Sequence, residues 1–159
     1  MNKKTLFQIF LGMTCFSLSS DCYSLPKNPQ VKAGTAEFKE VDPHTLEIRP
    51  SDQAILHYSH FDIGREEKVQ FIQKSSSSCV LNRVLESDPS QIFGSLESNG
   101  KVFLVNPSGI YFGPNSKVNV GSLIASTLDI SDQDFLDETY QFHFTKDSLI
   151  QNEGSLTSI

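Results

Sequence analysis

The side chains of this chain that could do chemistry are few and scattered. Its histidines are His44, His57, His60 and His143. Only His57 and His60 are close enough in sequence to share a metal ion, but side chains three positions apart on a strand point to opposite faces. A polysaccharide lyase needs carboxylates and a base on one face, yet Lys117 is the single charged residue from Val102 to Ala125. We therefore expect no enzymatic activity, no catalytic residue, no cofactor and no metal.

Acidic residues gather in one segment near the C-terminal end. They are Asp129, Asp132, Asp134, Asp137 and Glu138. The segment lacks the glycine at the sharp turn and the terminal glutamate spacing of a calcium-binding loop. We expect a solvated loop or a short helix around residues 132–137.

The first two dozen residues have the pattern of a secretory signal peptide. Lys3 and Lys4 form a basic head, residues 5–18 are mostly apolar, and serines follow. Cleavage fits after Ser19 or Ser24, and we favour Ser24, so residues 1–24 are the predicted signal peptide. Removal there would also take Cys15 and Cys22, and leave Cys79 alone as a buried apolar residue.

Residues 25–33 read as an extended lead-in, because Pro26 and Pro29 interrupt any regular element. Short strands follow at 35–38, 46–48, 54–58 and 69–72, with a turn at 42–44. The serine run 75–78 is interpreted as a corner between strands, and 141–144 as a further strand. Five asparagines are candidates for turn positions or for ladders of stacked amides: Asn82, Asn99, Asn106, Asn115 and Asn119.

The clearest pattern lies between Asn99 and Thr127. Apolar runs rich in β-branched and aromatic residues occupy 102–105, 110–112 and 118–120, and Gly, Pro, Asn and Ser fill 106–109, 113–116 and 121–122. Runs this short are typical of strands, with centres about eight residues apart. By themselves they fit either hairpins or the corners of a solenoid whose coils repeat every 20–25 residues or so. Within each run the residues spaced by two should face inward: Val102, Leu104, Ile110, Phe112, Val118 and Val120.

Composition agrees with a single all-β domain. The 159 residues are 38% hydrophobic, which is enough for a modest core. The 12 phenylalanines and the absence of tryptophan favour a β-rich interior over a helical bundle. The net charge of −6 gives no attraction to phosphate backbones, so we expect no nucleic-acid partner.

A long ordered string of motifs resembles a known family. It comprises Asn82-Arg83-Val84, Asp88-Pro89-Ser90, Ile92, Gly94, Leu96, Asn99-Gly100, Val102-Phe103-Leu104, Asn106-Pro107-Ser108-Gly109-Ile110, Phe112-Gly113, Val118-Asn119-Val120-Gly121 and Ala125-Ser126-Thr127. The string resembles the N-terminal secretion domain of two-partner secretion (TPS) exoproteins, of the filamentous haemagglutinin and high-molecular-weight adhesin type. The resemblance extends more weakly from about Gly34 to the end. It implies a right-handed parallel β-helix (a β-solenoid) with an antiparallel N-terminal cap.

The same resemblance implies which residues serve secretion. Asn82, Arg83 and Val84 form one candidate motif, similar to the high-molecular-weight adhesin branch. Asn106, Pro107, Ser108, Gly109 and Ile110 form the other, with Ser108 where family members carry a second asparagine. Serine enters a left-handed conformation less readily than asparagine. Whether this turn contacts the transporter or only forms a corner of the coil is left open. Tyr58 stands where relatives often have tryptophan, so its hydroxyl needs a partner if buried.

The resemblance implies that the chain is a secretion module. It would be recognised by the periplasmic domains of a cognate outer-membrane β-barrel transporter and would nucleate β-helix folding. The chain would pass through the periplasm and then be secreted or held at the outer-membrane surface. We expect residues 34–159 to form this domain, truncated before an adhesin-type passenger that would contact a host-cell surface. Residues 149–156 resemble the start of the next coil. The alternative is a self-standing carbohydrate- or surface-binding β-solenoid.

Overall fold

The computed structural model describes residues 24–158. The predicted signal peptide therefore lies outside the described residues, apart from Ser24. Within the described part, no helix is long and apolar enough to cross a membrane.

The described residues are almost entirely strands, with one short helix. In chain order they are β1 (Gln30–Ala33), β2 (Ala36–Asp42), β3 (Thr45–Pro50), β4 (Ala54–Tyr58), β5 (Lys68–Phe71), β6 (Cys79–Val84), β7 (Ser90–Ile92), β8 (Ser95–Val105), β9 (Ile110–Phe112), β10 (Lys117–Ser126), β11 (Asp129–Ile130), α1 (Asp132–Leu136), β12 (Phe142–His143), β13 (Ile150–Asn152) and β14 (Ser155–Ser158).

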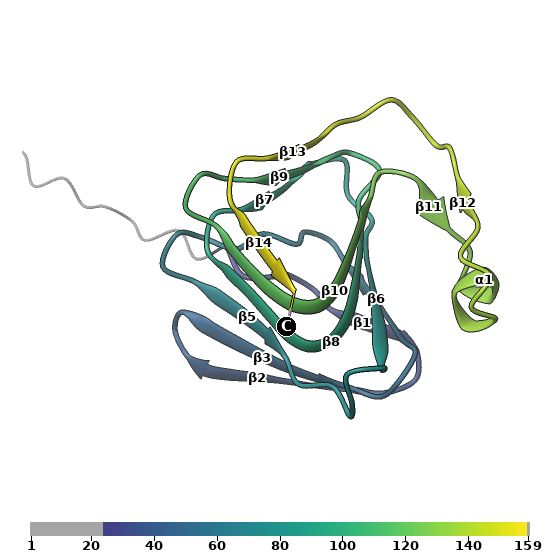
Figure 1. Ribbon diagram of the computed structural model, residues 1–159, viewed down its shortest axis with the longest axis horizontal. Helices are drawn as coiled ribbons and strands as arrows, with labels where there is room; N and C mark the ends of the chain where they lie inside the picture. The colour runs from purple at the N-terminus through teal and green to yellow at the C-terminus, as the bar shows by residue number, and fades with distance from the viewer. Residues whose placement is uncertain (1–23, 159) are drawn as a thin grey trace, which may run out of the picture.

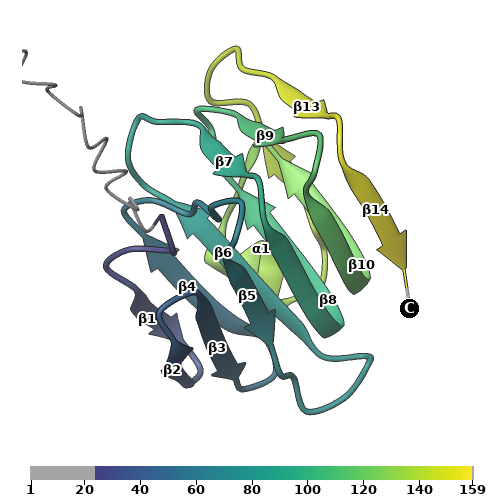
Figure 2. The ribbon, with the colours of Figure 1, turned by 90° about the vertical axis from the view of Figure 1, so that its left-hand side faces the viewer.

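Strands distant in sequence stack in parallel, which makes the molecule a β-solenoid of about four turns (Figures 1 and 2). Ser90 of β7 pairs with Ile110 of β9, and Ser95 of β8 pairs with Lys117 of β10. These partners lie about 20 residues apart, within the predicted repeat. The solenoid interpretation of the short runs is confirmed, and the hairpin interpretation is excluded.

Two long strands pass around a corner of the coil without ending. The first part of β8 pairs with β5 and its second part pairs with β6. β10 pairs in parallel with both parts of β8 and so follows the same path on the next coil. A turn expected at Gly121 is instead a bulge, where the register shifts between Val120 and Ser122. A Cβ at Gly121 would lie 3.0 Å from the carbonyl oxygen of Gly100. The prediction of a break was wrong because these glycines let two backbones bend together at close range.

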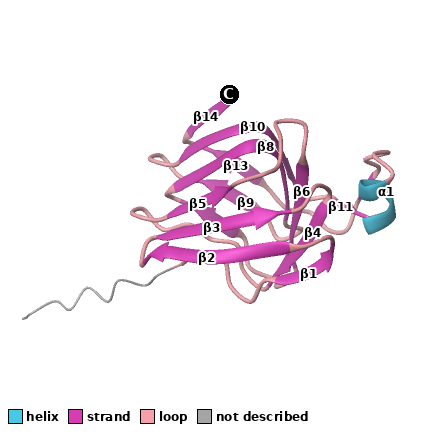
Figure 3. Ribbon diagram, turned by 90° about the horizontal axis from the view of Figure 1, so that it is seen from below, coloured by secondary structure: helices cyan, strands magenta, loops and turns pink. Residues whose placement is uncertain are grey.

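Antiparallel strands cap the N-terminal end of the solenoid, as the resemblance implied. β1 pairs with β4, and β2 pairs with β3, in both cases antiparallel. β2 is the last strand of its sheet on this side (Figure 3). The predicted turn at 42–44 is present, since the His44 amide donates to Oδ1 of Asp42, 2.8 Å away. The lead-in contributes strand β1 as well as extended chain.

The interior of the coils is a continuous apolar core. All six residues predicted to face inward are buried: Val102, Leu104, Ile110, Phe112, Val118 and Val120. The spacing by two therefore identified the correct face of each run. The serine run also forms its predicted corner, where the Ser78 amide donates to the carbonyl of Ser75.

A second cluster of buried apolar residues lies outside the coil, and the sequence pattern did not predict it. Between β10 and β13 the chain makes an excursion through β11, α1 and β12, which lies to one side of the solenoid (Figure 1). Phe135 of α1 packs edge-on against Phe103 of β8, with ring centroids 5.2 Å apart. Cys79 belongs to this cluster and is buried, as predicted for a small apolar residue.

Candidate functional site

The structure brings the two predicted motifs together on neighbouring coils. Asn82, Arg83 and Val84 lie in β6, and residues 106–110 form the turn from β8 into β9. The parallel register of β6 and β8 places Arg83 beside Val105, directly before that turn. Parallel stacking with a repeat of one coil thus aligns segments that lie about 20 residues apart in sequence.

Asn82 is fully buried and its amide bridges three coils. Its Oδ1 accepts a hydrogen bond from the Tyr58 hydroxyl at 3.2 Å, and its Nδ2 donates to the carbonyl of Phe103 at 3.1 Å. The predicted need of Tyr58 for a partner is met here. Burial raises the pKa of the Tyr58 hydroxyl, so it remains a donor under all ordinary conditions.

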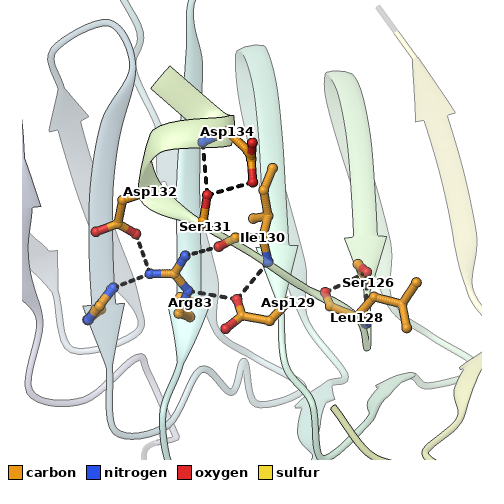
Figure 4. A network of polar contacts seen from close by, with 9 residues as sticks. Arg83, Ser126, Leu128, Asp129, Ile130, Ser131, Asp132 and Asp134 are labelled. Atoms are coloured by element: carbon orange, nitrogen blue, oxygen red, sulfur yellow. Dashed lines mark hydrogen bonds and ion pairs between the residues drawn. The ribbon is translucent and has the colours of Figure 1, made fainter. Parts of the chain in front are cut away.

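Arg83 is the anchor of the excursion (Figure 4). Its guanidinium donates to Oδ1 of Asp129 at 2.9 Å, to Oδ1 of Asp132 at 2.6 Å, and to the carbonyl of Ile130. Its side chain is only 10% exposed, whereas the two carboxylates are 39% and 49% exposed. A buried guanidinium is tolerated because its donors are satisfied by anions and a carbonyl.

His57 completes the surroundings of Arg83. Its Nε2 lies 2.7 Å from Nη1 of Arg83. Burial, and then the positive charge of Arg83, hold the pKa of His57 below its ordinary value of 6.5, while Asp132 opposes that shift. The neutral ring therefore accepts a hydrogen bond from the guanidinium.

The turn at 106–109 is closed by its own first residue. The Gly109 amide donates to the carbonyl of Asn106 at 3.0 Å, and the Ser108 amide donates to Oδ1 of Asn106 at 2.9 Å. The other end of the Asn106 side chain donates to the carbonyl of Asp88 and to Oγ of Ser90 on the preceding coil. Asn106 thus fastens one coil to another as well as shaping the turn.

Gly109 carries the unusual backbone of this turn. Its φ is +121°, which side chains rarely adopt, and its Cβ would lie 3.1 Å from the carbonyl oxygen of Leu149. Ser108, in contrast, does not have a positive φ. The expected difficulty of serine in a left-handed conformation therefore does not arise.

Most of the motif is inaccessible in the folded domain. Asn82, Arg83, Val84, Asn106, Gly109 and Ile110 are buried, and only Pro107 and Ser108 are half-buried. Ser108 accepts a hydrogen bond from Nζ of Lys146 at 2.8 Å. The folded motif offers little surface to another protein.

A family model described as the TPS secretion domain matches residues 41–157. This chain belongs to the TPS secretion domain family. It is therefore a two-partner secretion module, as the ordered motifs indicated.

Relatives from Haemophilus influenzae agree with this assignment. The crystal structure of the HMW1 secretion domain superposes with a TM-score of 0.78 and 40% identity, over 81% of this chain and 35% of that one. A curated heme/hemopexin-binding protein is 31% identical over 97% of this chain, and a second is 33% identical over 67% of it. The alignments span 17% and 12% of those two proteins, so this TPS secretion domain corresponds to a small part of each relative.

Two other parts of this TPS secretion domain contain side chains of the types that bind metals, namely the histidine pair His57 and His60 and the acidic segment. His60 lies 3.3 Å from Asp88, apart from His57 and its guanidinium partner. Residues 132–136 form the short helix expected for the acidic segment, capped by Ser131. No group of three or more metal-ligating side chains occurs within residues 24–158.

The expected ladder of asparagine amides is not formed by the described residues. Asn106 and Asn115 do occupy turns, as one alternative proposed. Asn82, however, has Leu56 and Leu104 as its lateral neighbours in the sheet. Asn82 forms no ladder because its amide bonds a tyrosine hydroxyl and a backbone carbonyl, and the Asn99 amide bonds the backbone of Gln73 instead.

The partners of Arg83 were missed in the sequence, although a signal was present. An arginine among the apolar residues of β6 requires compensating anions if buried. The acidic segment at 129–138 offered them, but the separation of more than 40 residues gave no way to pair the two.

Proposed function

We propose that this TPS secretion domain is a non-enzymatic module whose two motifs are recognised by the periplasmic domains of an outer-membrane β-barrel transporter before the chain folds. The burial of the motif side chains in the folded domain supports this order of events. A transporter can contact Asn82 and Asn106 only while the chain is extended. Recognition and folding then exclude one another.

Extended segments such as β8 and β10 present free backbone donors and acceptors before they fold. A periplasmic domain with an open sheet edge can bind such a segment by β-augmentation and hold its alternate apolar side chains in pockets. After passage, the same groups pair within the solenoid. A folded coil cannot slide back, so folding outside the cell supplies direction to transport.

Relatives suggest the wider setting of the module. We propose that a signal peptide directs the chain to the periplasm, and that the secretion domain precedes a passenger that reaches the cell surface or the medium. An adhesin-type passenger would contact the host-cell surface. Sequencing the DNA that follows the codon of Ile159 tests for a continued β-helical reading frame.

Co-expression with the cognate transporter tests recognition of the motif. Asn106→Ala removes a buried amide with three hydrogen-bond partners, so it lowers both stability and, on this proposal, secretion. Val118→Ala is the control, because it truncates the core outside both motifs. At a temperature where both variants are folded, Asn106→Ala should reach the medium in a smaller amount than Val118→Ala.

Equal secretion of the two variants, at matched stability, would mean that the turn is only a corner of the coil. Gly109→Val gives a second comparison, because a β-branched residue at φ +121° costs about 1–3 kcal/mol. Asn115→Ala, in an exposed turn outside both motifs, should leave secretion unchanged.

A further inference from the structure

Glu67 is a buried carboxylate without a charged partner among the residues that the structure describes. Its residue is 5% exposed, and no basic side chain among residues 24–158 forms an ion pair with it. Arg83, the other charged residue of the described part that is buried, has two carboxylates in contact. A buried charge is costly unless it is paired, so the surroundings of Glu67 require an explanation.

Two backbone amides donate hydrogen bonds to the Glu67 carboxylate, one to each oxygen. The Gly64 amide donates to Oε2 at 2.6 Å, within the tight turn in which the Glu67 amide donates back to the carbonyl of Gly64. The Ser24 amide donates to Oε1 at 2.8 Å, from a segment 43 positions earlier. One oxygen therefore closes a local turn, and the other accepts from Ser24, the residue directly before Leu25.

The residues directly after Ser24 are held firmly in place. Leu25 packs against the main core. Lys27 forms an antiparallel bridge with His60, in which the Lys27 amide donates to the His60 carbonyl at 2.9 Å and the Ser59 amide donates to the Lys27 carbonyl at 3.1 Å. A terminus created at this place would thus be fixed within three residues of its end.

We propose that Glu67 is the binding site for the α-ammonium group formed when the leader is removed after Ser24. The inference rests on the proposed export, and it assigns the new terminus to Leu25. A signal peptidase would hydrolyse the Ser24–Leu25 bond with one water molecule. The Ser24 carbonyl carbon gains the oxygen and departs with the leader as a carboxylate, and the Leu25 nitrogen gains the protons of an ammonium group.

The chain geometry suits this exchange. Adjacent backbone nitrogens lie roughly 3 Å apart, so the Leu25 nitrogen is close to the place that the Ser24 amide occupies beside Oε1. Cleavage removes the Ser24 donor and supplies a charged one in its vicinity. The Glu67 carboxylate now accepts only from uncharged amides, so an ammonium donor would add an ion pair to this contact and hold the segment that begins at Leu25 more tightly.

Chains with defined starts test the proposal without any transporter. One begins at Leu25 and one at Ser20, each with Glu67 or Glu67→Gln, and the exposed Glu66→Gln serves as the matched control. In the Leu25 chain, the titration midpoint of the α-amine, followed by NMR, should lie about 1 pH unit above that of its Glu67→Gln variant. Glu66→Gln should leave it unchanged, and the Ser20 chain should show no dependence on Glu67. Equal midpoints in the two Leu25 chains would overturn the proposal.

Two further measurements do not depend on the folding of Glu67→Gln. Acetylation of the α-amine should lower the melting temperature of the Leu25 chain more than that of the Ser20 chain, and equal losses would refute the pairing. Mass spectrometry of the exported protein should find Leu25 as its first residue, whereas another start would overturn the assignment. Failure of secretion would affect the proposed function alone.

Discussion

The hydroxyl of Tyr58 donates a hydrogen bond to Oδ1 of Asn82, 3.2 Å away, inside the apolar core of the solenoid. The same asparagine donates to the carbonyl of Phe103 on the next coil. One amide therefore satisfies a polar group on each of the two coils that flank its own, where an unpaired group would be costly.

Tyr58→Phe should destabilise the domain by about 1–3 kcal/mol, because it leaves Oδ1 of Asn82 buried without a donor. Urea unfolding measures this change. Tyr111→Phe is the control, since its hydroxyl meets Glu153 at the exposed surface and its loss should cost little. A double-mutant cycle of Tyr58→Phe with Asn82→Leu should give a non-additive result, and strict additivity would show that the bond is not formed.

Arg83→Met should release the excursion at residues 129–143 from the solenoid. The loss should be about 1.5–3 kcal/mol for hydrogen bonds to charged groups, towards the lower end because water already reaches both carboxylates. Hydrogen exchange should accelerate in β11 and α1 while the amides of β8 stay protected. Arg49→Met, which breaks an exposed pair with Glu47, should leave that pattern unchanged.

His57 should make stability fall in mildly acidic solution. Burial and Arg83 depress its pKa in the folded state below 6.5, with Lys32 acting in the same direction and Asp132 and Asp129 against it. Below pH 6.5 the unfolded chain therefore binds more protons, and the stability that is present above this pH is lost as the pH falls through the folded pKa. His57→Gln keeps an acceptor for Arg83 without the titration. The melting temperature of the parent should drop relative to this variant below pH 6.5, and parallel curves would contradict the prediction.

Phe112→Ala should remove about 3–5 kcal/mol, comparable to the whole stability of a small domain. The ring is buried in the coil interior, and the opposite-face neighbour Tyr111 is not. Thermal unfolding of Phe112→Ala beside Tyr111→Ala measures the contrast. A Phe112→Ala variant that melts within a degree or two of the parent would place the ring outside the core.

Local pattern was enough to predict much of this fold. Phe112 and Val118 could be assigned to the core because alternation along a strand has a period of two, whatever the strand pairs with. The turn before Ile110 was readable because Pro107 and Gly109 restrict the backbone by their own covalent structure. The motif string added the parallel arrangement, which short apolar runs alone left open between hairpins and coils.

The sequence by itself determined which residues face inward, where most turns fall and to which family the chain is similar, since each depends on neighbouring residues or on ordered motifs. Only the tertiary structure decided that Arg83 meets Asp129 and Asp132, that Glu67 receives the Ser24 amide, and that Gly121 forms a bulge and not a turn. These contacts join segments more than 20 residues apart. The charge and hydrogen-bonding groups of a residue predict that it needs a partner when buried, but the path of the chain determines which residue lies close enough to be that partner.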